Sequence, residues 1–228
     1  MSTTPSLAGS FQLVSGEVHS WCASLDVLPA TSARLYATLS LEERHRSARF
    51  RFERGRQRFI AAHGVLRELL GRYLQTRPGR ICYVHNAFGK PDLSPEFGGR
   101  LKFNLSHSAG LALVAIAADA DIGVDVEYIR TQPDDAEIAR CFFSTAEADQ
   151  LLSLPNHLHA EAFIRCWTRK EAYLKACGNG LTVPLNVAST DIAPAKRWSF
   201  FSLQPAPGYI GTLAIEGGCW RLEQWRWR

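Results

Sequence analysis

Apolar positions follow two different periods along the chain. Over residues 57–75, and again from about 157 to 177, they recur at spacings of three, four and seven, which is typical of helices with one buried face. Over 122–127 they alternate with small or charged residues, the period of a half-buried strand. Further strand-like runs lie at 81–84, 101–105, 111–118, 198–203, 209–215 and 219–227. The pattern predicts an α+β fold, with the last three runs forming a second antiparallel sheet.

Local signals set the ends of the helices. Ser40 and Ser144 each stand three residues before a glutamate, Glu43 and Glu147, which is the spacing of a capping box at a helix start. For Glu147 we prefer this capping role to a catalytic one. The Gly-Asn-Gly run at 178–180 tolerates positive φ and ends the second long helix.

A hairpin is predicted around the short turn at 119–121. The nearly continuous apolar run 111–118 precedes this turn and the alternating strand 122–127 follows it, which favours antiparallel pairing of the two. Ser106 and His107, at the end of the strand before them, would then lie on a strand neighbouring 122–127.

Strand alternation points Asp125 and Glu127 to the same side. Two carboxylates this close repel each other unless a cation or a proton lies between them, and oxygen ligands at this spacing suit Mg²⁺. Glu171, on the second long helix, is a third carboxylate available to the same ion. Taken alone, Glu171 and Lys175 are better interpreted as a surface pair one helical turn apart.

Composition describes an ordinary globular protein. The 228 residues are 46% apolar, enough for one sizeable core or two small ones. No apolar run approaches the roughly eighteen residues of a membrane span. The start, Met1-Ser2-Thr3-Thr4-Pro5, lacks the features of a signal peptide, so we expect a cytoplasmic protein. The six cysteines include no C-x-x-C pair, which favours reduced, buried thiols over zinc or redox chemistry.

Charge is strongly separated along the chain. Residues 34–102 carry 15 Lys or Arg against 6 Asp or Glu, whereas residues 119–149 carry 2 against 9. A basic region alone would favour nucleic acid, but an acidic cluster beside it would repel a polyanion. A small phosphate-rich ligand bridged to a metal suits both regions better.

The basic residues and one polar turn remain open to ordinary interpretations. Seven arginines fall within 44–58; the ordinary interpretation for most of them is a solvated basic face, with a minority contacting a phosphate ligand. Lys90 follows Gly89 in a stiff Gly-Lys-Pro turn, where a solvated surface lysine is the ordinary alternative. The turn 106–108, Ser-His-Ser, could hold a nucleophile, hold a phosphate or cap the backbone. Because there is no G-x-S-x-G elbow, we discount the nucleophile.

Four segments together resemble the signature segments of the surfactin-type 4′-phosphopantetheinyl transferases, over about residues 40–185. They are Phe-Gly-Lys-Pro at 88–91, Phe-Asn-Leu-Ser-His-Ser at 103–108, Gly-Val-Asp-Val-Glu at 123–127 and Trp-Thr-Arg-Lys-Glu-Ala-Tyr-Leu-Lys-Ala at 167–176. The resemblance implies two similar halves in a pseudo-twofold arrangement, each a small, largely antiparallel sheet packed on a long helix. We divide them into a basic half, 1–107, and an acidic half, 108–228.

The resemblance also implies the activity: transfer of the phosphopantetheine of coenzyme A to a serine of a carrier protein, with Mg²⁺. Asp125, Glu127 and Glu171 would hold Mg²⁺ on the pyrophosphate, and Lys175 would contact the same phosphates. Fatty-acid, polyketide and nonribosomal-peptide carriers are all possible partners.

The remaining binding residues also come from the resemblance. Ser106 and His107 would lie along the phosphates of coenzyme A, with His107 at the 3′-phosphate. The adenosine end would be anchored by Lys90 and a subset of Arg46, Arg54 and Arg58. Some relatives have a lysine where this chain has Glu43, and Arg46 would take over its work.

The mechanistic hypothesis is in-line attack by the carrier serine on the β-phosphorus, with 3′,5′-ADP leaving. Glu171 is the candidate base, directly or through water, and Lys175 would neutralise or protonate the leaving phosphate. The alternatives are a non-catalytic coenzyme A or nucleotide-binding module and a small nucleic-acid binder. We expect a monomer, because the two halves already supply both walls of the cleft.

Overall fold

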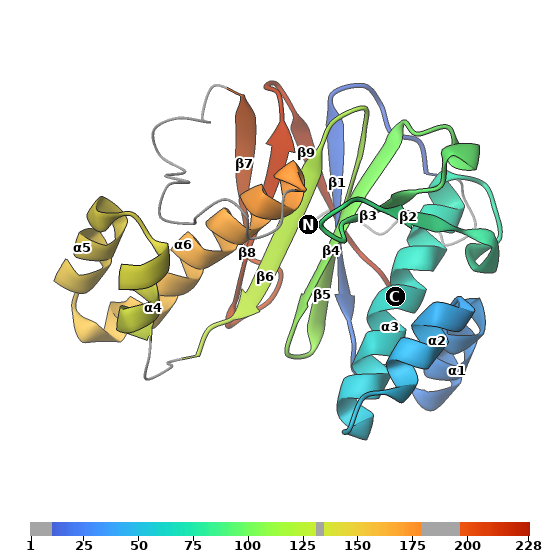
Figure 1. Ribbon diagram of the computed structural model, residues 1–228, viewed down its shortest axis with the longest axis horizontal. Helices are drawn as coiled ribbons and strands as arrows, with labels where there is room; N and C mark the ends of the chain where they lie inside the picture. The colour runs from blue at the N-terminus through green and yellow to red at the C-terminus, as the bar shows by residue number, and fades with distance from the viewer. Residues whose placement is uncertain (1–10, 131–134, 179–196) are drawn as a thin grey trace.

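The computed structural model describes residues 11–130, 135–178 and 197–228, and the structural statements below concern that part of the chain. It confirms the α+β class, with a four-stranded, a three-stranded and a two-stranded sheet among the described residues. Figure 1 shows the two larger sheets side by side at the centre, with one long helix outside each of them. These helices are α3 (Glu53–Tyr73) and α6 (Asn156–Cys177).

The first sheet has the strand order β4-β5-β1-β9. Its strands are β1 (Glu17–Ser24), β4 (Leu101–Ser108), β5 (Leu111–Ala118) and β9 (Arg221–Arg226). β9 runs parallel to β1, while β1–β5 and β4–β5 are antiparallel. The prediction that run 219–227 joins the second sheet is therefore wrong. Because β1 is buried along most of its length, it needs a partner on both edges, and Trp225 of β9 stacks on Trp21 of β1.

The second sheet has the order β6-β8-β7 and is antiparallel throughout. It consists of β6 (Ile122–Tyr128), β7 (Trp198–Leu203) and β8 (Tyr209–Glu216). The predicted hairpin between 111–118 and 122–127 is also wrong, because β6 pairs with β8. The reason is that β4 and β1 already occupy both edges of β5, so no edge is left for β6.

Smaller elements of the fold lie around α3 and around α6. Helices α1 (Pro29–Thr38) and α2 (Leu41–Ala48) pack beside α3, as does the small hairpin of β2 (Tyr83–His85) and β3 (Pro91–Leu93). Helices α4 (Asp135–Phe142) and α5 (Thr145–Ser153) lie beside α6, and β7 is the outer strand of the second sheet. Single 3-10 turns occur at Pro78–Arg80 and Pro95–Phe97.

The predicted helix ends are confirmed where they are described. In α2 the Ser40 hydroxyl accepts from the Glu43 amide while the Glu43 carboxylate accepts from the Ser40 amide, and Ser144 and Glu147 do the same in α5. Gly178 ends α6 at φ 69°. Asn179 and Gly180 lie outside the described residues.

The described residues form four hydrophobic clusters. One fills the space between α3 and the first sheet, and another lies between the two sheets and includes Leu113 and Ala115 of β5 with Val124 and Val126 of β6. β5 is therefore buried on both faces, which explains its nearly continuous apolar run. The other two pack α6 against α4 and α5 and against the second sheet. No helix among the described residues is long and apolar enough to cross a membrane.

Candidate active site

A glycine brings α6 against β6 at unusually short range. A Cβ atom added to Gly123 would lie 2.1 Å from the carbonyl oxygen of Ala172 and 2.4 Å from the amide nitrogen of Ala176. Only glycine fits this position, because neither backbone atom can move aside without displacing the helix. The contact sets Glu171 and Lys175 beside the carboxylates of β6.

β4 and β6 are edge strands of different sheets, and side chains join them where a backbone ladder is missing. Alternate residues of β4 accept hydrogen bonds from backbone N–H groups of β6. The pairs are Asn104 Oδ1 with Val124 N at 2.9 Å, Ser106 Oγ with Val126 N at 3.4 Å, and Ser108 Oγ with Tyr128 N at 3.2 Å. β6 is therefore joined to the first sheet by polar side chains of β4, and not by the hairpin with β5 that the sequence predicted.

The same two serines hold the carboxylates of β6. The Ser106 hydroxyl donates to Asp125 Oδ1 at 2.8 Å, and the Ser108 hydroxyl donates to Glu127 Oε2 at 2.5 Å. Asp125 is only 3% exposed. The hydroxyl proton of Ser106 is thus directed to Asp125, and its contact with coenzyme A stays a prediction.

Lys175 completes the surroundings of Asp125. Its ammonium lies 2.6 Å from Asp125 Oδ1 and 3.1 Å from Ser106 Oγ. Lys175 therefore reaches across from α6 to β6, which favours the site interpretation over an isolated surface pair with Glu171.

The surroundings of Glu127 and Glu171 disfavour the ionised form of both side chains. Burial raises the pKa of Glu127, the hydrogen bond from Ser108 opposes this, and the charge of Asp125 raises it further. Burial also raises the pKa of Glu171; the charge of Lys175 lowers it, and those of Asp125 and Glu127 raise it. The three carboxylates from β6 and α6 are therefore close enough to influence one another.

The two strand carboxylates suit a divalent cation. Asp125 Oδ2 is buried and has no hydrogen-bond partner in the described part of the chain, so it is an available ligand. No group of three or more His, Cys, Asp or Glu side chains in that part is arranged to hold a metal. Mg²⁺ is commonly bound by one or two carboxylates together with substrate phosphates and waters, so Asp125 and Glu127 fit it as a pair. Direct ligation by Glu171 stays a prediction.

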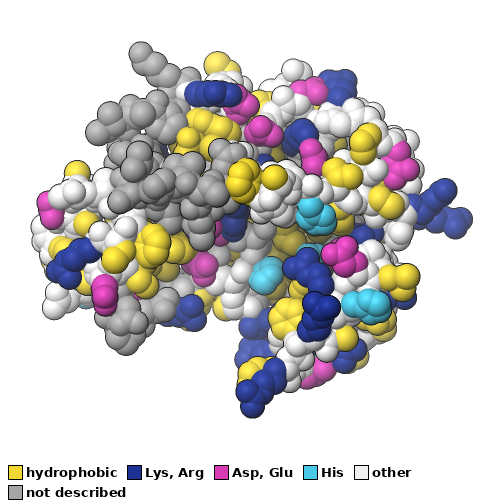
Figure 2. Space-filling model, in the orientation of Figure 1, with side chains coloured by type: hydrophobic (Ala, Val, Ile, Leu, Met, Phe, Trp, Pro, Cys, Tyr) yellow, Lys and Arg dark blue, Asp and Glu magenta, His cyan; other side chains and the backbone are white. Residues whose placement is uncertain are grey.

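A cavity of about 590 Å³ lies between α2, α3 and the strands β2–β4. Its lining includes Arg46, His63, His85 and His107, and it borders the Gly-Lys-Pro turn through Gly89 and Pro91. Figure 2 shows Lys, Arg and His side chains gathered over this half of the molecule. Burial, with the nearby charges of His63 and Lys175, lowers the pKa of His107, which lines this cavity from β4. The size and charge of the cavity suit a nucleotide.

The predicted arginines separate into two places. Arg46 lines the cavity, whereas Arg54 and Arg58 lie at the start of α3 and pair with Asp26 at 3.5 and 2.8 Å. The hydrogen bond from Arg58 holds the pKa of Asp26 below its usual value. Of the residues predicted to bind coenzyme A, Arg46 and His107 are the two that line this cavity.

Lys90 has an internal role that the sequence did not indicate. Its ammonium donates to the carbonyl oxygens of Ala176 at 2.8 Å and Ile122 at 3.2 Å, and burial lowers its pKa. Lys90 therefore ties the β2–β3 turn to the end of α6 and the start of β6. Its contact with coenzyme A stays a prediction.

Other important residues were also missed by the sequence interpretation. Asn104 and Ser108 share the i, i+2 spacing of Ser106, and this alternation of polar residues in a strand was a readable signal. His63 and Asp26 gave no signal, because only the folded chain brings them to Glu43 and to Arg58.

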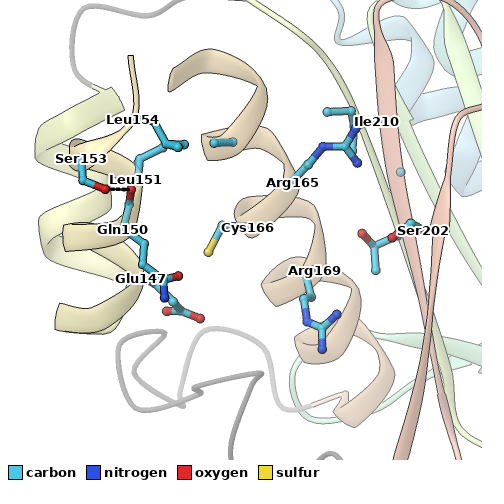
Figure 3. A pocket seen from close by; sticks show the side chains of 13 residues that line it. Glu147, Gln150, Leu151, Ser153, Leu154, Arg165, Cys166, Arg169, Ser202 and Ile210 are labelled. Atoms are coloured by element: carbon cyan, nitrogen blue, oxygen red, sulfur yellow. Dashed lines mark hydrogen bonds between the residues drawn. The ribbon is translucent and has the colours of Figure 1, made fainter. Parts of the chain in front are cut away.

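A second pocket of about 560 Å³ lies between α5, α6 and the strands β7 and β8. Figure 3 shows Glu147 entering it from α5, Arg165 and Arg169 from α6, and Ser202 from β7. It contains none of the predicted site residues. Glu147 pairs with the buried Lys170 at 2.8 Å and caps α5, which agrees with its predicted structural role.

The fold and this geometry define a class: an α+β enzyme with an acidic cluster beside a basic, nucleotide-sized cavity, suited to metal-assisted transfer of a phosphate-containing group. Sequence comparison is more specific. The profile described as the 4′-phosphopantetheinyl transferase superfamily matches residues 121–216.

Similar proteins agree with that match. The chain is 40% identical to the 4′-phosphopantetheinyl transferase HetI of Nostoc sp., over 94% of each protein. It is 34% identical to a putative 4′-phosphopantetheinyl transferase of Synechocystis sp., over 70% of this chain and 65% of that protein. It is 28% identical to the 4′-phosphopantetheinyl transferase Sfp of Bacillus subtilis, over 81% of each. The chain therefore belongs to the 4′-phosphopantetheinyl transferase superfamily, as its motifs predicted.

Proposed function

We propose that the protein transfers the 4′-phosphopantetheine group of coenzyme A to a serine hydroxyl of an acyl or peptidyl carrier protein, with Mg²⁺, and releases 3′,5′-ADP. The observation that carries the proposal is the cluster of Asp125, Glu127, Glu171 and Lys175 beside the basic cavity. An acidic cluster that holds a cation next to a cavity with basic walls matches a diphosphate flanked by a nucleotide.

Coenzyme A would lie with its nucleotide in the cavity and its diphosphate toward β6. Arg46 and His107 line that cavity and would contact the nucleotide phosphates. Gly89 and Pro91, on either side of Lys90, also line it, and contact of Lys90 with the adenosine end would require its ammonium to leave the carbonyl oxygens of Ile122 and Ala176. Arg54 and Arg58 lie at the start of α3, where they pair with Asp26, and neither of them lines that cavity.

The carboxylates of Asp125 and Glu127 would hold Mg²⁺, with Glu171 as a third ligand or as a base. When bound, the ion neutralises negative charge on the diphosphate. Ser106 and Lys175 keep the Asp125 side chain in place, so this carboxylate is oriented before coenzyme A arrives.

In the transfer step the carrier serine oxygen forms a bond to the β-phosphorus of coenzyme A, and the bond from that phosphorus to the oxygen bridging to the α-phosphate breaks. The proton of the serine passes to Glu171, directly or through one water, since a free hydroxyl is too weakly acidic to react. Lys175 stabilises the charge on the departing 3′,5′-ADP or gives it a proton.

Mass spectrometry of an apo carrier protein tests the proposal. With coenzyme A and Mg²⁺ the carrier should gain the mass of one phosphopantetheine group, and Asp125→Ala and Glu171→Gln should abolish the gain. Glu161→Gln is the matched control, because Glu161 is on α6 but is paired with Arg165 at the surface. Full transfer by Asp125→Ala would refute the metal assignment.

The main alternative is a coenzyme A or nucleotide-binding module without transfer activity. It predicts binding of coenzyme A with no mass gain on any fatty-acid, polyketide or nonribosomal-peptide carrier. A nucleic-acid binder would instead show salt-dependent binding to DNA or RNA, and the acidic residues of β6 beside the basic wall oppose it.

We further propose that the protein acts in the cytoplasm as a monomer. The cavity between α2, α3 and β2–β4 and the carboxylates of β6 and α6 all belong to one chain. Sedimentation at working concentration should give the mass of one chain, and a stable dimer would contradict this part.

A further inference from the structure

Ser108 makes two hydrogen bonds with consecutive residues of β6. Its hydroxyl accepts from the backbone N–H of Tyr128 at 3.2 Å and donates to Glu127 Oε2 at 2.5 Å. Because both the N–H of Tyr128 and the carboxylate have only one role to offer, donor and acceptor respectively, the hydroxyl proton is directed at the carboxylate. Ser108 is the last residue of β4 and is half-buried, so its position is fixed by the sheet.

The same arrangement occurs one strand repeat earlier. Ser106 accepts from the N–H of Val126 at 3.4 Å and donates to Asp125 Oδ1 at 2.8 Å. Each serine therefore accepts from one residue of β6 and donates to the carboxylate just before it. A contact repeated in register along two strands is a property of the strand pair, not of one side-chain orientation.

We propose that Ser108 is a positioning residue for Glu127, and that it sets the orientation in which this carboxylate receives the metal. The inference rests on the proposed function, because it takes Asp125 and Glu127 as the metal-binding pair. A glutamate has one more rotatable bond than an aspartate, and Glu127 is nearer the exposed end of β6 than Asp125. Glu127 therefore has more side-chain freedom to lose, and a hydrogen bond that fixes it beforehand strengthens metal binding.

Ser108 does not need to touch coenzyme A or the carrier serine for this role. Its hydroxyl is already engaged on both sides, by a backbone N–H and by a carboxylate. The expected effect of its loss is therefore on metal affinity, with little effect on the KM for coenzyme A when metal is saturating.

The test is direct binding of Mn²⁺ in the presence of coenzyme A and without carrier protein, followed by electron paramagnetic resonance of the free ion. Ser108→Ala should weaken Mn²⁺ binding by about 10-fold, as is usual when a group supporting a metal ligand is removed. Ser108→Thr keeps the hydroxyl on a residue that suits a strand and should restore most of the affinity.

Ser199→Ala is the matched control. Ser199 is a half-buried strand serine in the neighbouring sheet, and its hydroxyl donates to the carbonyl oxygen of Gly217 at 2.7 Å, away from the carboxylates. Its loss should leave Mn²⁺ binding unchanged. Circular dichroism of each variant checks that the fold is intact.

Three results would overturn the inference. They are unchanged Mn²⁺ affinity in Ser108→Ala, an equal loss in Ser199→Ala, or a rise in the KM for coenzyme A at saturating metal in place of weaker metal binding. Because no carrier is present in the binding test, its outcome is separate from the proposed transfer. A wild-type protein that transfers the group while Ser108→Ala binds metal normally would refute only the positioning role.

Discussion

Asp125 is a buried acidic residue whose surroundings are built from three elements. Ser106 of β4 donates to it, Lys175 of α6 pairs with it, and its own strand, β6, holds the backbone between them. A buried carboxylate is costly unless it is hydrogen-bonded and paired. Here Oδ1 takes both partners, which leaves Oδ2 as the atom with unused binding capacity.

Lys175→Ala should separate catalysis from stability. We expect transfer to fall by about 100-fold, because the ammonium that would stabilise the leaving phosphate is gone. The free energy of unfolding should fall by about 1–3 kcal/mol, because the buried Asp125 carboxylate loses its cation but keeps the hydrogen bond from Ser106. Single-turnover transfer and urea unfolding measure the two effects.

Lys102→Ala is the control for that experiment. Lys102 is as exposed as Lys175, 29% against 30%, and pairs with Asp92 at 2.5 Å, but Asp92 is 41% exposed and lies outside the carboxylate cluster. An equal fall in transfer for both variants would show that Lys175 acts only through general electrostatics.

Glu43 carries a pH-dependent part of the stability. Burial alone would raise its pKa, but hydrogen bonds from His63 and the Ser40 amide and the charge of Arg67 outweigh burial and lower the pKa to about 2. A lowered pKa means that the ionised form stabilises the fold. This contribution is complete above the unfolded pKa of about 4.5 and is lost as the pH falls through about 2.

Glu43→Gln should therefore destabilise the protein by about 3 kcal/mol at pH 7, and the difference from wild type should shrink between pH 4.5 and pH 2. Urea unfolding at several pH values measures it. Glu42→Gln, on the exposed side of α2, should show no such trend. A difference that is constant with pH would contradict the assignment.

At the scale of elements, α6 and β6 make the most consequential contact. Gly123→Ala would put a methyl group within 2.1 Å of a backbone oxygen, so α6 must move away from β6. We expect a loss of about 1–3 kcal/mol in unfolding free energy, together with weaker Mn²⁺ binding, because Glu171 and Lys175 move with the helix. Gly218→Ala, which has nothing within 4 Å, is the control and should change neither.

The sequence could predict those features of the fold whose cause lies within a few neighbouring residues. The alternation in 122–127 was enough to predict that Asp125 and Glu127 share a face, and the capping boxes at Ser40 and Ser144 predicted two helix starts, because strand and helix periods are local. The hairpin failed because pairing depends on which strand edges are free. Both edges of β5 are taken, and that is decided by β1, which is distant in sequence.

The candidate site shows the same limit. Motif resemblance identified Asp125, Glu127, Glu171 and Lys175, and the structure brings these four side chains near one another. The serine contacts to the carboxylates were not predicted, since they depend on two sheet edges meeting side by side without a ladder. Reading polar alternation in residues 104–108 as an inward face would have been the only route to them.

At the scale of the whole molecule, the chain does not keep its two halves separate. The boundary at 107/108 stays a prediction, and strand pairing crosses it: β5 and β9 follow residue 107 and yet belong to the first sheet with β1 and β4. A fragment of residues 1–107 would therefore lack the strand that lies between β4 and β1 as well as the outer partner of β1.

We expect fragments 1–107 and 108–228, produced separately, to lack cooperative thermal unfolding. The first would retain α3 but only the separated strands β1 and β4, so much of the core against α3, including Val114 and Ile116 of β5, would be missing. The second would carry β5 without either of its neighbours, β4 and β1, and β9 without β1, which leaves these strand edges unpaired. Circular dichroism melting and amide dispersion in NMR spectra measure the outcome, with the full chain as reference. A cooperative transition in fragment 1–107 would mean that β1, β4 and α3 suffice for a domain, and that the crossing strands only join two units already able to fold.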